Sequence, residues 1–187
     1  MNALEKVLSL ITPSTKVIAI DGRSASGKTT FSYSLAERIG GSVIHMDDFF
    51  LPPELRSEER YREAGGNVHY ERFKEEVLDN LSSSHPFSYR RFNCSLMSYD
   101  EDPIIVDPAF PVIIEGAYSL SPRFGKYYDL SVFMTISKEE QMRRIKIRNG
   151  EEKASVFASR WIPLEEAYFQ EMNIEQIADL VIDCDNK

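Results

Sequence analysis

The sequence is poor in the residues that cross-link small proteins or anchor them in membranes. Its 187 residues include two cysteines, Cys94 and Cys184, which lie far apart and form no metal or redox spacing. This favours free thiols in a reducing cytoplasm over a disulfide scaffold. No apolar run reaches 18 residues, and residues 1–16 lack the charged start and long apolar core of a signal peptide. We therefore expect a cytoplasmic protein with no membrane partner.

Positive charge is also scarce. The chain has 22 lysines and arginines against 30 aspartates and glutamates, which gives a net charge of −8. General nucleic-acid binding needs a basic face, so this balance argues against it. The negative net charge does not exclude a local cluster of cations around a small anionic ligand. The composition, 42% hydrophobic, is that of an ordinary globular protein, and we expect residues 1–187 to form one domain with a sizeable core.

The most informative stretch is residues 17–30, VIAIDGRSASGKTT. Residues 17–20 form a short, apolar, β-branched run that is typical of a buried strand, and residues 22–29 match the pattern G-x-x-x-x-G-K-[ST]. A helical pattern follows and ends at Gly40-Gly41. Strand, glycine-rich loop and helix in this order favour a phosphate-binding loop over a glycine turn with a solvated lysine.

The positions of this loop have distinct chemical tasks. Gly22 and Gly27 permit a close approach of the main chain to a phosphate, with N–H groups pointing inward at the start of the helix. Lys28 supplies charge for the β- and γ-phosphates of ATP, and the Thr29 hydroxyl supplies a ligand for Mg²⁺. The residues expected to hold the nucleotide in this loop are Gly22, Ser24, Ala25, Ser26, Gly27, Lys28, Thr29 and Thr30.

Strand and helix patterns alternate along the rest of the chain. Further strands are expected at residues 42–46, 104–106, 111–116, 129–136 and 178–182, with one or two edge strands within 87–97. Helices are expected over residues 2–11, from about 67 to 81, from 137 to Asn149-Gly150, and over 155–175 with a break at Pro163. The alternation predicts an α/β fold, with a parallel sheet between two layers of helices.

Acidic residues stand where two predicted strands end. Asp47 follows the strand at 42–46, and Glu115 lies at the end of the strand at 111–116. Ligands of open α/β sheets bind at the carboxyl ends of strands, so both acids are expected near the phosphate-binding loop. There Asp47 can orient or deprotonate an attacking hydroxyl, and Thr29, Glu115 and Asp47 can serve Mg²⁺. The alternative for each acid is a structural role in a turn or cap.

Two flanking segments are also candidates for the site. Residues 54–66 are highly charged and end in two glycines, as in an exposed, mobile segment beside an acceptor pocket. His69, Tyr70 and Arg72 follow and could border that pocket, although a lone histidine is more often structural. The helix after Ser137 carries several cations, which can neutralise transferring phosphoryl charge or form a solvated face. The aromatic and apolar positions of 161–172, including Trp161, are expected in the core.

These stretches together resemble the uridine kinase and phosphoribulokinase-like family of P-loop kinases, and also the nicotinamide riboside kinases. The resemblance covers nearly the whole chain and rests on DGRSASGKTT, MDDFFLPPE, GGNVHYERF, PVIIEGAYSL, RRIKIRNG and RWIPLEEAYFQEM. It implies a P-loop three-layer α/β/α sandwich with a mainly parallel sheet and a small helical lid at about 140–160. An acceptor-side segment is implied at about 48–73, with ATP and Mg²⁺ as cofactors and a small molecule as partner.

The resemblance also implies roles for individual residues. Asp47 aligns with the carboxylate that orients or deprotonates the acceptor hydroxyl, Glu115 with the acid that organises Mg²⁺, and Phe50 with an aromatic next to the acceptor base. The lid arginines that would contact phosphates are Arg143, Arg144 and Arg148. The resemblance gives catalytic roles to Arg144 and Arg148, together with Lys28 and Asp47. Uridine kinases usually have an aspartate near the position of His69, and an imidazole accepts fewer hydrogen bonds from a ribose than a carboxylate does.

We therefore expect an ATP-dependent kinase acting on the hydroxyl of a small metabolite, with a nucleoside such as uridine or cytidine as the leading acceptor. Nicotinamide riboside, pantothenate or another hydroxyl compound are the alternative acceptors. From a different class, a nucleotide-dependent switch or regulatory ATPase would use the same loop and acids without an acceptor. The sequence leaves open the acceptor, the preference for ATP over GTP, and whether the chain forms a homo-oligomer.

Overall fold

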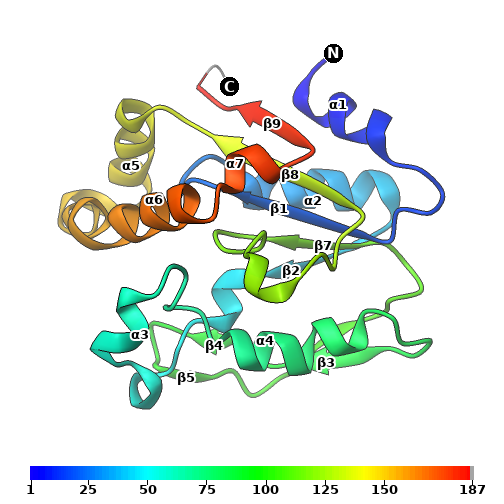
Figure 1. Cartoon of the computed structure of the whole chain (residues 1–187), viewed down its shortest axis with the longest axis horizontal. Coiled ribbons are helices and arrows are strands. Elements are labelled where there is room, and N and C mark those ends of the chain that lie inside the picture. The colour runs from blue at the N-terminus through cyan, green and yellow to red at the C-terminus, as the bar shows by residue number, and fades with distance from the viewer. Residues whose placement is uncertain (186–187) are drawn as a thin grey trace.

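The structure, a computed structural model, describes residues 1–185 and is built on a five-stranded sheet (Figure 1). The strand order is β2 (Ser42–His45), β7 (Val112–Glu115), β1 (Val17–Gly22), β8 (Leu130–Thr135) and β9 (Leu180–Asp183). All four neighbouring pairs are parallel. The carboxyl ends of the strands therefore meet at one edge, and β1, which leads into the phosphate-binding loop, lies in the middle.

Two apolar layers cover the two faces of this sheet. Side chains alternate along β1, so that Ile18 and Ile20 join one buried cluster while Val17 and Ala19 join the other. The first cluster contains side chains of α1 (Ala3–Leu10) and α2 (Lys28–Ile39). The second contains side chains of α4 (Tyr70–Glu76), α6 (Ile162–Glu171) and α7 (Ile174–Ile177). The expected three-layer α/β/α arrangement is confirmed.

The segment between β2 and β7 forms a small lobe, drawn in cyan and green in the lower part of Figure 1. Its 3-10 turns are Met46–Phe49, Pro53–Leu55 and Leu78–Asn80, its helices are α3 (Glu58–Arg62) and α4, and its strands are β3 (Phe87–Tyr89), β4 (Phe92–Asn93), β5 (Ser98–Tyr99) and β6 (Ile104–Val106). β3 pairs with β6 and β4 with β5, both antiparallel. The strands expected within 87–97 and at 104–106 exist, but they lie outside the central sheet.

The helices differ from the expected ones at their ends. α4 stops at Glu76, five residues before the expected end, and the side-chain amide of Asn80 donates to the carbonyl oxygens of Glu75 and Glu76 there. α5 (Lys138–Val156) does not stop at Asn149-Gly150. Gly150 has φ 83°, so the helix is interrupted there and then resumes. The backbone freedom of glycine permits this kink, and the helix continues to Val156.

The region after α5 is continuous where a break was expected. A π-helical turn, Phe157–Trp161, leads directly into α6, and Pro163 occupies the second position of α6. Pro163 has no N–H to donate, and it lies where the hydrogen-bond pattern changes from π-helical to α-helical, so the chain stays helical past it. The chain breaks instead at Asn173, which has φ 51°. In Figure 1, α5 and α6 lie together at one end of the molecule, and residues 138–171 are called the helical arm below.

One buried carboxylate joins the sheet to two distant segments. Asp21, in β1, accepts hydrogen bonds from the N–H groups of Gly22 (2.6 Å), Tyr118 (3.2 Å) and Leu120 (2.9 Å). It also accepts one from the hydroxyl of Tyr168 on α6, at 2.8 Å. Burial raises the pKa of Asp21 to about 6, although these hydrogen bonds oppose the shift. Asp21 thus fixes the segment after β7 and, through Tyr168, helix α6 beside the phosphate-binding loop.

The raised pKa of Asp21 predicts how stability changes with pH. The folded-state pKa, about 6, exceeds the ordinary value of 3.8, so Asp21 stabilises the fold at low pH and this contribution is lost as the pH rises through 6. Asp21→Asn cannot titrate. The unfolding free energy of the natural protein should therefore fall relative to the variant by about 2 kcal/mol between pH 4 and pH 7. Urea denaturation at both pH values measures this difference, and a change in the opposite direction would mean that the hydrogen bonds outweigh burial.

Candidate active site

A cavity of about 780 Å³ lies at the carboxyl edge of the sheet. Its walls include the residues that follow three neighbouring strands: the phosphate-binding loop after β1, Asp47 after β2, and Glu115 to Tyr118 at the end of β7. Residues of α5, the π-helical turn and α6 line it as well. The parallel sheet therefore gathers at one cavity segments that are far apart in the sequence.

The backbone of the loop is shaped to receive an anion. Gly22 has φ 140°, and a Cβ there would lie 2.1 Å from the carbonyl oxygen of Met134, so only glycine fits. Gly27 has φ 97° with open space around it. Within residues 1–185, the N–H groups of Gly27, Lys28 and Thr29 donate to no acceptor. Free N–H groups at the positive end of the twelve-residue helix α2 fit a chain of phosphates.

The side chains of the loop complete this cradle. The Lys28 ammonium is buried and donates to the carbonyl oxygens of Gly22 (2.8 Å) and Arg23 (2.9 Å), which holds it at the loop. Among the loop residues expected to hold the nucleotide, the cavity is lined by Ser24, Ala25, Gly27, Lys28, Thr29 and Thr30. Ser26 is buried beneath the loop, and its hydroxyl has no partner within residues 1–185.

Thr29 and Glu115, the expected magnesium ligands, are in direct contact. The Thr29 hydroxyl donates to Glu115 Oε1 at 2.9 Å, and His45 Nδ1 lies 2.5 Å from the same oxygen. His45 Nε2 lies in turn 2.8 Å from the hydroxyl of Tyr33. Burial lowers the pKa of His45, but its hydrogen bond and charge interaction with Glu115 raise it more, so the net shift is upward. Sequence reasoning missed His45, although its place at the end of β2 was a signal.

Asp47 lines the same cavity at the start of the 3-10 turn Met46–Phe49. Asp47 is exposed at the cavity surface. Partial desolvation by the surrounding protein raises its pKa, and the negative charge of Glu115 adds to the rise, while Lys28 opposes it. No group of three or more His, Cys, Asp or Glu side chains within residues 1–185 could hold a metal ion by itself. A Mg²⁺ beside Thr29, Glu115 and Asp47 would therefore need oxygen ligands from the nucleotide and from water.

The arginines of α5 divide into two groups. Arg144 and Arg148 are four residues apart, share one helix face and line the cavity. Arg144 donates to Glu140 (2.7 Å) and to the carbonyl oxygens of Ala25 (3.4 Å) and Cys184 (2.7 Å). Arg143 is exposed, pairs with Glu140 and does not line the cavity. The structure thus corrects the expectation that Arg143 lies at the nucleotide, because one helical step turns its side chain away.

The expected acceptor residues near α4 are also separated by the structure. Phe50 lines the cavity, but His69, Tyr70 and Arg72 do not. Arg72 is buried against the 3-10 turn Met46–Phe49, where it donates to the carbonyl oxygen of Asp48 at 2.6 Å. Tyr70 donates to Glu63 at 3.2 Å. This corrects the expectation that the start of α4 borders the pocket: Tyr70 and Arg72 connect parts of the small lobe instead, and His69 Nδ1 is buried without a hydrogen-bond partner in residues 1–185.

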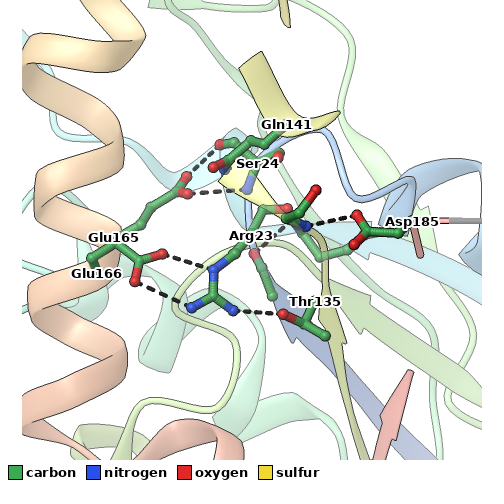
Figure 2. Close-up of polar contacts among 10 residues, drawn as sticks. Arg23, Ser24, Thr135, Gln141, Glu165, Glu166 and Asp185 are labelled. Atoms are coloured by element: carbon green, nitrogen blue, oxygen red, sulfur yellow. Dashed lines mark hydrogen bonds and ion pairs between the residues drawn. The ribbon is translucent and has the colours of Figure 1, made fainter. Parts of the chain in front are cut away.

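Sequence reasoning missed the carboxylate that holds the loop in place. Ser24 is bonded to two helices: its N–H donates to Glu165 of α6 at 3.0 Å, and its carbonyl accepts from Gln141 of α5 at 3.0 Å (Figure 2 labels the three residues). The Ser24 hydroxyl also donates to Glu165. Burial raises the pKa of Glu165, while the nearby Lys28 charge lowers it. Both helices are thus hydrogen-bonded to one residue of the loop, through the peptide groups on either side of it.

Arg23 makes a second connection beside the first (Figure 2). Its guanidinium forms two hydrogen bonds with Glu166, at 2.8 and 3.2 Å, and a third with the Thr135 hydroxyl at 2.7 Å. The guanidinium carbon also lies 5.8 and 5.7 Å from the ring centroids of Phe133 and Phe169. The first variable position of the loop is therefore fixed to both β8 and α6.

The pattern of α6 held the missed signal. Trp161, Glu165 and Tyr168 are spaced so that they share one helix face, and an acid in such an apolar stripe is unusual. The stripe was expected in the core, but Trp161 is half-buried and lines the cavity. No comparable pattern marked the remaining members of the cavity wall, which are Leu51, Arg56, Tyr61, Asn67, Cys94, Met97, Gly116, Ala117, Tyr118, Phe157 and Arg160.

Comparisons with known proteins support the fold. No protein-family profile matches the chain, and no curated protein of similar sequence was found. A solved structure described as a possible uridine kinase from Bacillus stearothermophilus shares 19% identity, over 96% of this chain and 95% of the other, with a TM-score of 0.71. A candidate fructose transport system kinase from Silicibacter sp. TM1040 shares 22% identity over 96% of each chain, with a TM-score of 0.73.

A more distant similarity is to D-glycerate 3-kinase from Cryptococcus neoformans, with 13% identity over 87% of this chain and 83% of the other, and a TM-score of 0.55. At these identities the similarity concerns the fold. The chain therefore has the fold of the P-loop kinases, and its structural neighbours include uridine kinase-like proteins. The expected fold class is confirmed, while the neighbours differ in the acceptor that their names give. Within residues 1–185, no helix is long and apolar enough to span a bilayer.

The contact between Glu165 and Ser24 predicts a specific loss of stability. Glu165→Ala leaves the Ser24 N–H without an acceptor in a water-poor site, so the unfolding free energy should fall by about 2 kcal/mol. Glu165→Gln keeps an acceptor oxygen and should lose less. The matched control is Glu166→Ala, which removes a partly exposed ion pair and should cost about 1 kcal/mol or less. Equal losses in the two alanine variants, measured by urea denaturation, would contradict a special role for Glu165.

Proposed function

We propose that the protein is an ATP-dependent kinase that phosphorylates a hydroxyl group of a small metabolite. The observation that carries this proposal is the convergence on one cavity of three elements: the free N–H groups beside Lys28, the Thr29–Glu115 pair, and Asp47. The first element suits the phosphates of a nucleotide, the second suits a magnesium ion, and the third suits the proton of an attacking hydroxyl.

The residues present fit both cofactors. When bound, ATP supplies the phosphoryl group, and Mg²⁺ neutralises charge on its phosphates. Lys28 and the free N–H groups of the loop would hold those phosphates, and Thr29, Glu115 and Asp47 are the candidate oxygen ligands of the ion. Arg144 and Arg148 would face the transferring group from α5.

Asp47 would orient the acceptor hydroxyl and take its proton. Its raised pKa makes it a stronger base than an ordinary aspartate, while the nearby Lys28 limits the rise. Catalysis would then consist mainly of positioning the two reactants and stabilising charge, because phosphoryl transfer requires little covalent help from the protein.

The flanking segments would close over the reactants. We propose residues 140–160 as a lid and residues 48–73 as the acceptor side of a single kinase domain spanning 1–187. A nucleoside such as uridine or cytidine is the leading acceptor from the sequence resemblance, and Phe50, Tyr61 and Trp161 of the cavity wall offer aromatic faces for a base. Nicotinamide riboside, pantothenate and other hydroxyl compounds are the rival acceptors.

Substitution of Asp47 tests the proposed reaction. Asp47→Asn should lower acceptor-stimulated ADP release by about a hundredfold or more, because the amide cannot take the proton, while binding of ADP without Mg²⁺, which depends on the phosphate-binding loop, should stay nearly unchanged. The matched control is Asp48→Asn: Asp48 does not line the cavity and accepts a hydrogen bond from Tyr89 at 2.9 Å. That variant should keep most of its turnover.

Two results would overturn these assignments. Normal turnover by Asp47→Asn would refute the role of Asp47. ATP hydrolysis that no hydroxyl compound stimulates, with nucleotide binding intact, would favour the nucleotide-dependent switch. The panel for this assay consists of nucleosides, nicotinamide riboside, pantothenate and simple sugars.

Glu115 offers a separate test of the metal site. Glu115→Gln removes a charged oxygen ligand beside Thr29, so the Mg²⁺ concentration that gives half-maximal activity should rise about tenfold or more. Glu37→Gln, an exposed change on α2 outside the cavity, is the control and should keep the natural Mg²⁺ dependence. The same Mg²⁺ dependence in both variants would exclude Glu115 from the metal site.

A further inference from the structure

The cavity contains arginines that the proposed reaction does not use. Most arginines of this acidic chain pair with a carboxylate, as Arg23, Arg60 and Arg91 do. Three arginines that line the cavity, Arg56, Arg148 and Arg160, have no carboxylate within ion-pair distance in residues 1–185, and the proposed reaction uses only Arg148 of these. Guanidinium groups without a carboxylate partner can bind an anionic ligand that enters the cavity.

The contacts of Arg56 and Arg160 place them on the acceptor side of the cavity. Arg56 lies in the segment after Asp47. Its Nε donates to the carbonyl oxygen of Leu51 at 2.9 Å and its Nη2 to Met97 Sδ at 3.6 Å, which fixes the guanidinium and leaves its Nη1 for a ligand. Arg160, on the π-helical turn, is exposed, and its guanidinium carbon lies 4.9 Å from the ring centroid of Tyr61 in α3 and 4.8 Å from that of the neighbouring Trp161. The contact with Tyr61 reaches from the helical arm to the small lobe.

The acids of the cavity lie elsewhere. Glu115 contacts Thr29, and Glu165 contacts Ser24, so both belong to the phosphate-binding side. Asp47 interacts with the charges of Glu115 and Lys28, which places it near that side too. An acceptor with a hydroxyl at one end and an anion at the other would be repelled at its anionic end by these acids and attracted by Arg56 and Arg160. The charge distribution therefore sets its orientation, with the hydroxyl toward Asp47.

We infer that the acceptor is a hydroxyl compound that carries an anionic group, a carboxylate or a phosphate, and that Arg56 and Arg160 bind this group. This inference rests on the proposed kinase function and narrows its acceptor class. It favours a hydroxy acid or a sugar phosphate over an uncharged nucleoside. Arginine suits this task because its planar guanidinium binds either anion through two parallel hydrogen bonds.

A binding experiment tests the inference without turnover. Cys94 lines the cavity and is exposed, whereas Cys184 is buried, so N-ethylmaleimide should alkylate Cys94 selectively. With Mg-ADP bound to occupy the phosphate-binding loop, alkylation is followed by mass spectrometry in the presence of matched anionic and neutral compounds. The carboxylate arm compares D-glycerate with glycerol and pantothenate with pantothenol, and the phosphate arm compares ribose 5-phosphate with ribose and uridine monophosphate with uridine.

Protection of Cys94 is expected from the anionic member of at least one pair and not from its neutral partner, and the arm that protects identifies the anion. Arg56→Gln and Arg160→Gln should each raise the half-protecting concentration about tenfold or more. Arg62→Gln, on α3 but outside the cavity lining, is the control and should leave it unchanged. If no anion protects Cys94, or if both variants behave like the control, the inference is wrong.

ADP release with the same pairs separates this inference from the proposed function. Stimulation by an anionic member, with a KM about tenfold higher in Arg56→Gln and an unchanged KM for ATP, would support both. Protection of Cys94 without any stimulation of ADP release would support the proposed anion site and refute the proposed kinase function. Stimulation by a neutral member that equals or exceeds that by its anionic partner would keep the kinase and overturn the inference.

Discussion

Asp21 is buried in the central strand, and its carboxylate holds the groups that surround the site in a fixed relation. It accepts hydrogen bonds from Gly22 at the start of the phosphate-binding loop, from Tyr118 and Leu120 after β7, and from Tyr168 on α6. Glu165, one turn before Tyr168, binds the loop from the cavity side through Ser24. The loop is therefore held between two buried carboxylates, one below it in the sheet and one on the helical arm.

This arrangement explains how the N–H groups of the phosphate-binding loop are held in place. Free N–H groups that face one cavity would normally turn toward other acceptors, but the peptides around them are fixed by Asp21, Glu165 and Gln141. A preformed site loses little conformational freedom on binding, which favours affinity and exact positioning of the reacting atoms. The cost is the burial of two acids whose pKa values are raised.

Much of the fold and of the nucleotide half of the site could be predicted from the sequence. The signals were local: the apolar run before Gly22, the loop pattern itself, and acids that directly follow predicted strands. Parallel strands bring their carboxyl ends together, so strand prediction was enough to place Asp47 and Glu115 at one cavity. Arg144 and Arg148 also follow from helical periodicity, and the same periodicity would have excluded Arg143.

The acceptor half was less predictable because its contacts are long-range. Arg72 was expected at the pocket, but the packing of α4 against the turn after β2 buries it under Phe49, and no local pattern reveals that packing. Arg56 and Arg160 meet the cavity from segments about a hundred residues apart in the chain. Pro163 and Gly150 were treated as helix breaks, whereas a π-helical turn before the proline and a kink at the glycine both leave the chain helical.

The strand order has a consequence for how the protein is made. β1 pairs with β7 and β8, and the Asp21 carboxylate binds partners 97, 99 and 147 residues further along the chain. Contacts of such long range form late and slowly, because the intervening chain must first be brought into a compact arrangement. During synthesis the loop sequence leaves the ribosome early but cannot be fixed until α6 has followed it. Until then the nascent chain exposes the apolar strand β1, which would make early chaperone contact valuable for this protein.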